Sequence, residues 1–216
     1  MPTVTLYGLE RSVYTRIARL ALEEKGIAYA LNEVEIFGPQ GVPSDHLARH
    51  PFGRIPVLEH RGFWLYETSA ITRYVDEAFV GPPLQPEDPR LRARINQVIG
   101  LLDAYAYRPM VWGVFVERVR VPQAGGTADE AKIAAALDAA RTCLDALDAI
   151  VTCKPYLVAP TISLADVHAY PMLRYLALAP EGAALLAERP LLSRWLEKIG
   201  ARPSAQRTRG RYELAL

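Results

Sequence analysis

His50-Pro-Phe-Gly-Arg-Ile-Pro-Val-Leu58, followed by Tyr66-Glu-Thr-Ser-Ala-Ile71, is the part of the sequence that decides the expected fold. A central β-strand rarely tolerates proline, because proline has no N–H for the hydrogen-bond ladder. Pro56 is therefore expected at the start of a strand or in a tight turn. A cis peptide in that turn would direct the backbone of Ile55 outward as a free hydrogen-bonding edge. We expect this edge to receive an extended, peptide-like ligand.

Glu67 and Thr68 open an apolar run with helical spacing, about ten residues after Pro56. An acid and a hydroxyl at a helix N-terminus offer side-chain and backbone polar groups where an anion is stabilised. Together with the edge at Ile55, they predict a binding site for a small ligand that carries both peptide groups and charge.

These two motifs resemble the glutathione-binding half of the cytosolic glutathione transferases, whose pattern is Gly-x-Ile/Val-Pro-x-Leu followed by Glu-Ser-x-Ala-Ile. The matching residues here are 53–58 and 67–71, with Thr68 keeping the hydroxyl of the usual serine. The resemblance extends over the whole chain. It implies an α/β N-terminal thioredoxin-like domain plus an all-α C-terminal helical bundle, glutathione as co-substrate, and a homodimer.

Composition excludes several other classes of function. Twenty-five basic and 24 acidic side chains leave a net charge of +1, so no bulk field favours nucleic acid or an anionic membrane. There is no apolar run near 18 residues and no leading signal segment, which predicts a soluble, cytoplasmic protein. Cys143 and Cys153 have no metal-ligand spacing, and there is no P-loop or dinucleotide fingerprint. We therefore expect neither a metal nor a nucleotide.

The pattern of apolar residues and turn residues predicts two domains. The expected elements of the first are strands at 4–7, 28–36, 56–59 and 63–66 and helices at 13–25, 44–49 and 67–78. This β-α-β-α-β-β-α order is that of a thioredoxin-like domain. The stiff segment Gly81–Pro86 marks the boundary. We predict a glutathione-binding domain at 1–79, a linker at 80–88 and an all-helical domain at 89–216 that contributes the electrophile site.

Apolar stripes predict the helices of the second domain. One long helix carries Leu91, Ile95, Val98, Leu102 and Tyr105 on a single face and is expected to be interrupted near Pro109. Further stripes lie at 133–151 and 190–200. A capping-box-like start at 163–166 precedes another apolar helix and resembles the folding signature of the family's helical domain.

Ser12 is the expected catalytic residue. A free thiol has a pKa of about 8.5 and is mostly protonated at pH 7, so glutathione must be activated to become a nucleophile. Ser12-Val-Tyr-Thr-Arg16 resembles the Ser-x-x-Ser/Cys/Thr-Arg stretch of serine-type members, of the theta-, phi- or nu-like bacterial kind. This resemblance implies that the Ser12 hydroxyl donates a hydrogen bond to the thiolate. From the residues alone, Ser12 could equally be a helix N-cap.

Two tyrosines are alternative catalytic residues. Tyr7 falls close to where tyrosine-type classes place their thiolate partner, at the end of the first strand, and could otherwise pack in that strand. Tyr14 could reach the ligand from the helix. No cysteine occupies residues 10–15, which argues against the cysteine-type members and against glutaredoxin-like disulfide exchange.

The resemblance also implies how the rest of glutathione is held. The backbone of Ile55, before Pro56, would pair antiparallel with the cysteinyl segment. Glu67 and Thr68 would hold the ammonium and carboxylate of the γ-glutamyl end, and Arg54 would lie near the glycine carboxylate. Gln40 and His50 are further candidates for glutathione binding.

Aromatic and basic residues in the first long helix of the second domain suggest an electrophile pocket. The candidates are Tyr105, Arg108, Trp112 and Phe115. An aromatic stripe on a helix is more often core than pocket, so both interpretations stay open here. Phe52 resembles the aromatic residue with which some classes contact the partner subunit, and it could also pack under its own loop.

The sequence thus predicts a glutathione transferase that activates the glutathione thiol as thiolate for conjugation to hydrophobic electrophiles. Two alternatives remain. One is a glutathione-dependent isomerase, dehalogenase or reductase on the same fold. The other is a non-enzymatic, glutathione-transferase-like ligand-binding protein. The chain keeps the acid–hydroxyl pair Glu67–Thr68 and the loop hydroxyl of Ser12, which favours an enzyme. A fold by itself does not establish turnover.

Overall fold

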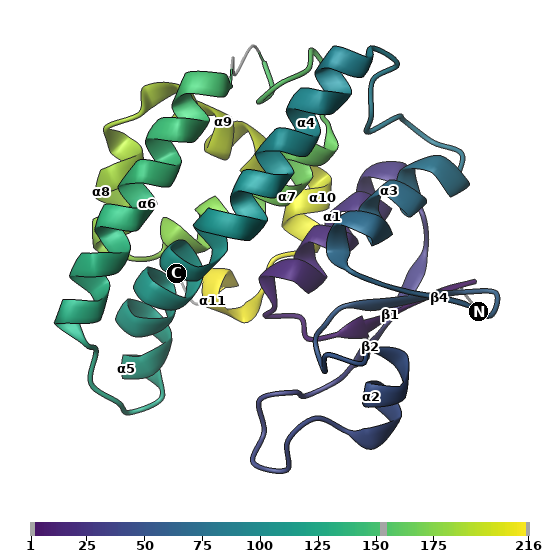
Figure 1. Cartoon of the computed structure of the whole chain (residues 1–216), viewed down its shortest axis with the longest axis horizontal. Helices are drawn as coiled ribbons and strands as arrows, with labels where there is room; N and C mark the ends of the chain where they lie inside the picture. The colour runs from purple at the N-terminus through teal and green to yellow at the C-terminus, as the bar shows by residue number, and fades with distance from the viewer. Residues whose placement is uncertain (1–2, 152–154, 215–216) are drawn as a thin grey trace. The chain divides into compact units, whose positions relative to one another are not determined.

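A computed structural model describes residues 3–151 and 155–214 of the chain (Figure 1). Cys153 lies outside these residues. The chain forms two compact units. The first comprises the residues up to Leu84 together with the segment that begins at Pro203, and the second comprises Gln85–Arg202. The last helices of the chain therefore belong by their contacts to the N-terminal unit.

The first unit is built on a four-stranded sheet with the order β2-β1-β3-β4. Its strands are β1 (Val4–Gly8), β2 (Tyr29–Glu33), β3 (Val57–His60) and β4 (Phe63–Tyr66). β1 pairs parallel with β2 and antiparallel with β3, which pairs antiparallel with β4. The second strand is shorter than the expected 28–36 and ends at Glu33, although the next residue, Val34, still donates its N–H to the carbonyl of Gly8 at 3.2 Å.

Helices α1 (Val13–Lys25) and α3 (Thr68–Ala78) pack against each other and cover one face of the sheet, while the short α2 (Ser44–Arg49) lies on the other side (Figure 1). Val4 and Leu6 have no exposed surface and face the two helices. The order β1-α1-β2-α2-β3-β4-α3 confirms the predicted thioredoxin-like arrangement. The unit is completed by α10 (Pro203–Arg207) and α11 (Arg211–Leu214).

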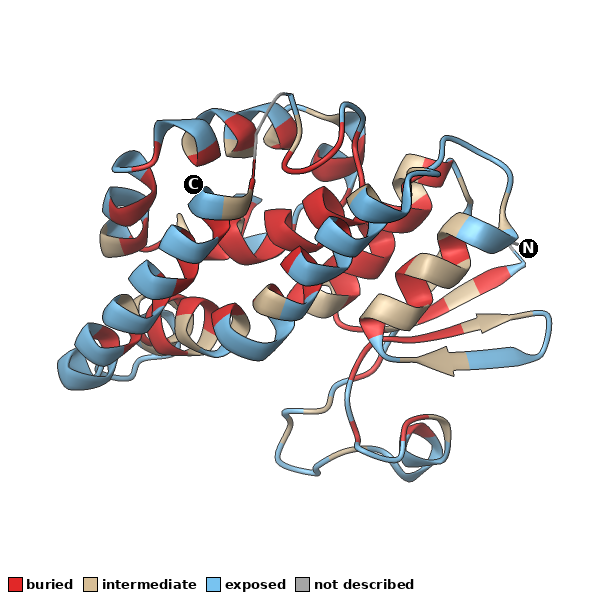
Figure 2. Ribbon diagram, turned by 45° about the horizontal axis from the view of Figure 1, so that its top comes forward, coloured by how far each residue is buried: buried red, intermediate tan, exposed pale blue. Residues whose placement is uncertain are grey.

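Every regular element of the second unit, over the residues that the structure describes, is a helix. They are α4 (Pro89–Leu101), η1 (Leu102–Ala106), η2 (Arg108–Arg120), α5 (Val121–Gln123), α6 (Glu130–Ile150), α7 (Leu164–Leu176), α8 (Pro180–Ala187) and α9 (Pro190–Gly200). Their buried stripes are visible in Figure 2. The prediction of a thioredoxin-like domain plus a helical bundle is thus confirmed.

The expected interruption near Pro109 was wrong. The helical run continues through this proline, but η1 and η2 have the wider i→i+5 hydrogen-bond pattern of a π-helix. Buried side chains continue along this run at Leu102, Ala106, Met110, Val114 and Phe115, so the wider helix still presents an apolar face. Tyr105 does not share their face and is 69% exposed, which corrects its expected place in the apolar stripe.

The predicted capping box before α7 is confirmed and forms a buried polar centre. Asp166 accepts hydrogen bonds from Ser163 N–H at 2.9 Å and from Ser163 Oγ at 2.8 Å. It also accepts from Leu157 N–H at 2.9 Å and from Trp195 Nε1 at 2.7 Å. Burial raises the pKa of the Asp166 carboxyl, although these hydrogen bonds act in the opposite direction. The motif therefore joins the start of α7 to a preceding loop and to α9.

Candidate functional site

Ser12 lies at the N-cap of α1, half-buried between the first strand and the first helix. Its Oγ accepts a hydrogen bond from Thr15 N–H at 3.3 Å. A hydroxyl has one hydrogen and two lone pairs, so this contact leaves the hydrogen available to donate. The N-terminus of α1 also carries the positive end of the helix dipole. The position therefore unites a hydroxyl donor with a local field that favours an anion.

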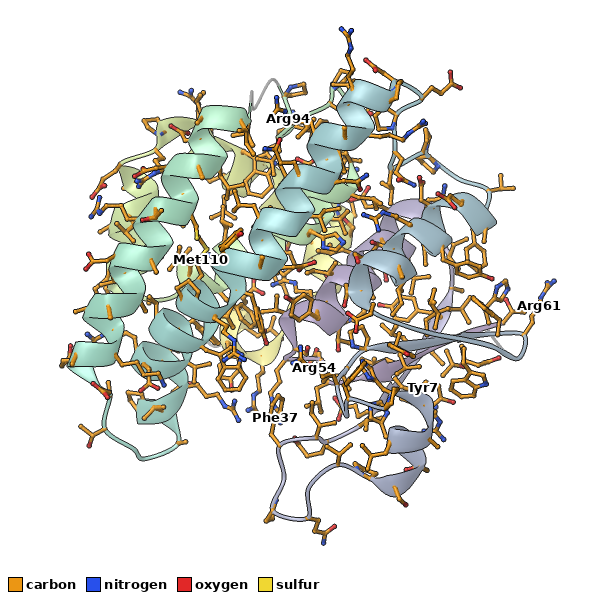
Figure 3. All side chains as sticks on the ribbon, viewed as in Figure 1. Tyr7, Phe37, Arg54, Arg61, Arg94 and Met110 are labelled. Atoms are coloured by element: carbon orange, nitrogen blue, oxygen red, sulfur yellow. The ribbon has the colours of Figure 1, made fainter. Side chains whose placement is uncertain are left out.

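Tyr7 has a different environment. Its ring lies 5.4 Å from the ring of Trp64, and the guanidinium of Arg49 lies 4.7 Å from the Tyr7 ring centre. Arg49 belongs to α2, so Tyr7 packs on the side of the sheet that α2 occupies (Figure 3). Tyr14 lies in the first turn of α1 and is half-buried. The aromatic and cationic contacts account for Tyr7 as a packing residue.

The segment before β3 presents a backbone edge. The Ile55–Pro56 peptide bond is cis, and Pro56 precedes the strand, as its missing N–H predicts. Over the described residues, no main-chain hydrogen bond joins Ile55 to another backbone group. The preceding Gly53 has a φ of 61°, in the left-handed region that favours glycine. An extended ligand backbone could add to this edge by ordinary strand pairing.

Glu67 and Thr68 stand at the start of α3. Glu67 is the N-cap residue, and its φ of 68° is unusual for a residue with a side chain. Its side chain makes no capping hydrogen bond to the helix, and Thr68 is buried. Strained backbone of this kind is concentrated at functional sites, where the surroundings impose it. The N-terminus of α3 can therefore serve an anionic group of an external ligand, and the Glu67 carboxylate, which does not cap the helix, can serve a cationic one.

His50 is brought into the same neighbourhood. Its buried ring lies 4.6 Å from the ring of Tyr66. Burial lowers the pKa of the His50 imidazole from its ordinary value, and the charge of Glu67 acts in the opposite direction. The positive charge of Arg54 lowers the pKa further. The structure thus places His50 within range of the charges of Arg54 and Glu67. Gln40 is exposed in the turn that precedes α2.

Sequence reasoning missed His46. This residue is buried on α2, and its Nε2 lies 2.7 Å from the carbonyl oxygen of Arg54. The ring centres of His46 and His50 are 6.3 Å apart. The available signal was the spacing of two histidines four residues apart, which places them on neighbouring turns of a helix. That signal gave no indication of the loop that His46 contacts.

The electrophile-binding candidates belong to the second unit and differ in burial. Tyr105 and Arg108 are exposed. Trp112 is half-buried, and its Nε1 donates to the hydroxyl of Tyr107 at 3.0 Å. Phe115 is 2% exposed and packs on Tyr175 with a ring separation of 4.5 Å, which accounts for it as a core residue. The exposed members therefore remain the stronger candidates for ligand contact.

Within 3–151 and 155–214, no group of three or more His, Cys, Asp or Glu side chains is placed to hold a metal ion. In the same part of the chain, no helix is both long enough and apolar enough to span a membrane.

Comparisons with known proteins agree with this geometry. The chain matches the family models of the glutathione S-transferase N-terminal domain over residues 6–83 and C-terminal domain over residues 130–198. It is 30% identical over 213 residues to glutathione S-transferase 4 of Zea mays. This match covers 95% of this chain and 92% of the maize protein.

Two solved structures are similar to this chain over nearly its whole length. The apo form of glutathione S-transferase III has a TM-score of 0.83 at 29% identity, covering 96% of this chain and 95% of the other. A theta class glutathione S-transferase from the citrus canker pathogen Xanthomonas axonopodis pv. citri, with glutathione bound, has a TM-score of 0.76 at 30% identity. This match covers 96% of this chain and 97% of the other.

Proposed function

This chain belongs to the glutathione S-transferase family, and we propose that it activates the glutathione thiol as a thiolate at Ser12 for conjugation to hydrophobic electrophiles. The observation that carries the proposal is the arrangement at the start of α1. The Ser12 lone pair is used by Thr15 N–H, at 3.3 Å, and its hydrogen is left to donate toward the thiol. The chain is thus an enzyme of the transferase type, and Ser12 acts as a hydrogen-bond donor rather than as a nucleophile.

In the proposed reaction, the glutathione thiol loses its proton to solvent, and the resulting thiolate accepts a hydrogen bond from Ser12. The helix N-terminus stabilises the same negative charge. The sulfur electron pair then attacks the electrophile. A carbon–sulfur bond forms, and either a leaving group departs with its electron pair or the adduct takes up a proton. The site supplies the thiolate at neutral pH, where the free thiol is mostly protonated.

We propose that the peptide part of glutathione is held by the residues around Ile55 and Glu67. The Ile55 backbone pairs with the cysteinyl unit, because this edge has no main-chain partner within the described residues. The Glu67 carboxylate binds the γ-glutamyl ammonium, and the start of α3 at Thr68 binds the neighbouring carboxylate. Arg54 binds the glycine carboxylate. Gln40 and His50 remain further candidates.

For the electrophile, we propose a contribution from the exposed residues of the π-helical segment, Tyr105 and Arg108, together with the half-buried Trp112. Aromatic rings offer a large apolar surface with little conformational freedom, which suits flat hydrophobic substrates. The proposed homodimer draws support from exposed aromatic residues of the first unit. Phe52 is 70% exposed, and Phe63 and Trp64 are 48% and 42% exposed, so these side chains leave apolar surface that a second copy of the chain could cover.

The test is a spectroscopic titration of bound glutathione. Thiolate absorbance in the ultraviolet would be followed from about pH 5 to pH 9 for the wild type, Ser12→Ala and Tyr7→Phe. A hydrogen bond to a charged group contributes about 1.5–3 kcal/mol, or roughly one to two pKa units. We expect Ser12→Ala to raise the pKa of the bound thiol by this amount and to slow conjugation accordingly, while Tyr7→Phe leaves the pKa unchanged.

The other outcomes are informative in different ways. If Tyr7→Phe raises the thiol pKa and Ser12→Ala does not, the catalytic role belongs to Tyr7. If neither does, Tyr14→Phe tests the remaining hydroxyl of the site. Glutathione could also bind with the pKa of its thiol lowered and yet form no conjugate with a panel of aromatic halides and enals. The isomerase, dehalogenase or reductase activity would then be the better assignment.

A further inference from the structure

His46 makes one polar contact that no role assigned above uses. The side chain has no exposed surface, and its Nε2 lies 2.7 Å from the carbonyl oxygen of Arg54. Its other ring nitrogen, Nδ1, is also buried and has no hydrogen-bond partner within the described residues. Burying a polar ring with an unpartnered nitrogen disfavours the folded state. An apolar side chain would fill the same space without that cost, so the Nε2 contact is the feature that distinguishes histidine here.

The chemistry of this contact defines the donor. A carbonyl oxygen only accepts, so His46 Nε2 carries the hydrogen and donates it to Arg54. The Arg54 carbonyl and the Ile55 N–H belong to the same planar peptide unit. In a trans unit these two groups point in opposite directions. The cis bond lies one residue later, between Ile55 and Pro56, so it leaves the Arg54–Ile55 unit trans. Anchoring the carbonyl toward α2 therefore directs the Ile55 N–H away from α2.

Neighbouring contacts tie the same loop to α2. His50 N–H donates to the carbonyl of His46 at 2.8 Å and ends the helix, and Gly53 N–H donates to the carbonyl of His50 at 2.9 Å. These bonds hold the loop as far as Gly53. Beyond Gly53, the peptide between Arg54 and Ile55 is held by His46 Nε2. The side chain thus extends the anchoring of the loop to the peptide unit that would receive the ligand.

We propose that His46 is a positioning residue for glutathione binding, whose Nε2–H holds the Arg54 carbonyl and so aims the Ile55 N–H at the cysteinyl carbonyl of the ligand. The proposal rests on the proposed function, since it assigns a role at the same site. His46 does not touch glutathione in this arrangement. It affects the glutathione affinity by fixing the orientation of the Arg54–Ile55 peptide. The activation of the thiol at Ser12 does not depend on His46.

Two substitutions separate this role from simple packing. In His46→Gln the amide Nε2 is as many bonds from Cα as the imidazole Nε2, so the donor is kept at a similar reach. In His46→Asn the amide nitrogen stands at the place of Nδ1, and the donor to Arg54 is lost. His60→Gln is the matched control. His60 is a half-buried histidine of the same unit, and its replacement removes a 2.8 Å contact between Nδ1 and the Tyr74 hydroxyl.

Glutathione binding would be measured by calorimetry, and the steady-state constants with a soluble aryl halide. We expect His46→Asn to raise both the glutathione Kd and its KM about tenfold, the factor that follows if the released Arg54–Ile55 peptide is in the binding orientation for about a tenth of the time. The kcat at saturating glutathione should stay within about twofold of the wild-type value. The pKa of the bound thiol should stay within a few tenths of a unit of its wild-type value. His46→Gln should restore most of the affinity, and His60→Gln should leave it unchanged.

Contrary results would be unambiguous. Unchanged affinity in His46→Asn, equal losses in His46→Asn and His46→Gln, or an equal loss in His60→Gln would each overturn the positioning role. If His46→Asn does not fold, His46→Gln can be compared with His46→Leu. Glutamine keeps a hydrogen-bond donor at this position, whereas leucine replaces the imidazole with an apolar side chain. Failure of the wild type to bind glutathione would instead remove the proposed function itself, so the two failures are distinguishable.

Discussion

The side chain of His50 illustrates how a single residue in the candidate site responds to its surroundings. It is buried against Tyr66, and the nearby charges of Glu67, His46 and Arg54 act on its ring. Burial is the largest influence and favours the neutral imidazole, which lowers the pKa. Protonation of His50 in the folded protein therefore costs more than protonation in the unfolded chain, where the ring is hydrated.

This difference predicts a pH-dependent stability. The folded pKa lies below the unfolded value of about 6.5, so the unfolded chain takes up the proton first as the pH falls. The stability that neutral His50 contributes is present above about pH 6.5 and is lost as the pH falls toward the folded pKa. We expect the wild type to lose more thermal stability than His50→Gln between pH 7.5 and pH 5.5, as measured by the Tm from circular dichroism.

His60→Gln serves as the control for this measurement, because it removes a histidine of the same unit that pairs with Tyr74. If the Tm of His60→Gln falls with pH as little as that of His50→Gln, the effect does not belong to His50 in particular. If the Tm of the wild type and of His50→Gln falls equally with pH, the acid sensitivity belongs to other groups.

At the scale of an element, the π-helical segment η2 depends on a close approach to α6. A Cβ built on Gly113 would lie 2.3 Å from the Cβ of Ala136, far inside van der Waals contact. The absence of a side chain at Gly113 is therefore what allows the two helices to pack at this point. Gly100, on α4, has nothing within 4 Å of the same position.

These two glycines predict opposite effects of the same substitution. Gly113→Ala should lower the free energy of unfolding by about 1–3 kcal/mol, because overpacking forces the helices apart. Gly100→Ala should raise it by up to about 1 kcal/mol, because alanine is the better helix former. Urea titrations followed by circular dichroism measure both. A Gly113→Ala variant as stable as the wild type would show that the η2–α6 contact adjusts without strain.

At the scale of the whole molecule, the end of the chain completes the unit that holds the candidate site. Arg16 of α1 and Glu213 of α11 form an ion pair whose side chains are 0% and 1% exposed. Arg19 donates to the carbonyl of Arg207 at 3.2 Å, and Arg207 pairs with Glu23. Figure 1 shows α10, in yellow, beside α1, in purple. Helix α1, which Ser12 caps, is thus held along one side by residues from the last two helices of the described chain.

The buried pair predicts a large effect of a conservative change. Glu213→Gln removes the countercharge that Glu213 supplies to a buried guanidinium, and the loss of one partner of such a pair costs about 3–5 kcal/mol. Glu188→Gln is the control, since the Glu188 side chain is half exposed and pairs with the half-exposed Arg141 and, at 3.6 Å, with Arg189. The control should change the free energy of unfolding by less than about 1 kcal/mol. Denaturant titrations of the two variants compare them, and equal small losses would show that the Arg16–Glu213 pair contributes little.

The sequence was most informative where the deciding interactions are local. Ser12 as an N-cap, the start of α3 at Glu67 and Thr68, the capping box at Ser163 and the turn at Pro56 all follow from groups within a few residues of one another. The order of the elements followed in the same way, from apolar spacings of two or 3.6 residues. The assignment of Ser12, Tyr7 or Tyr14 to catalysis stays a prediction, because it depends on a ligand and not on the local backbone.

By itself, then, the sequence determined the order of the strands and helices, the caps that begin them and the family to which the chain belongs. Only the tertiary structure decided that His46 holds the Arg54 carbonyl, that Glu213 neutralises Arg16 and that the helix through Pro109 adopts a π pattern. The physical reason is the range of the interactions. Caps and turns act between neighbours in the chain, whereas a buried donor or countercharge finds its partner only when distant segments have packed together.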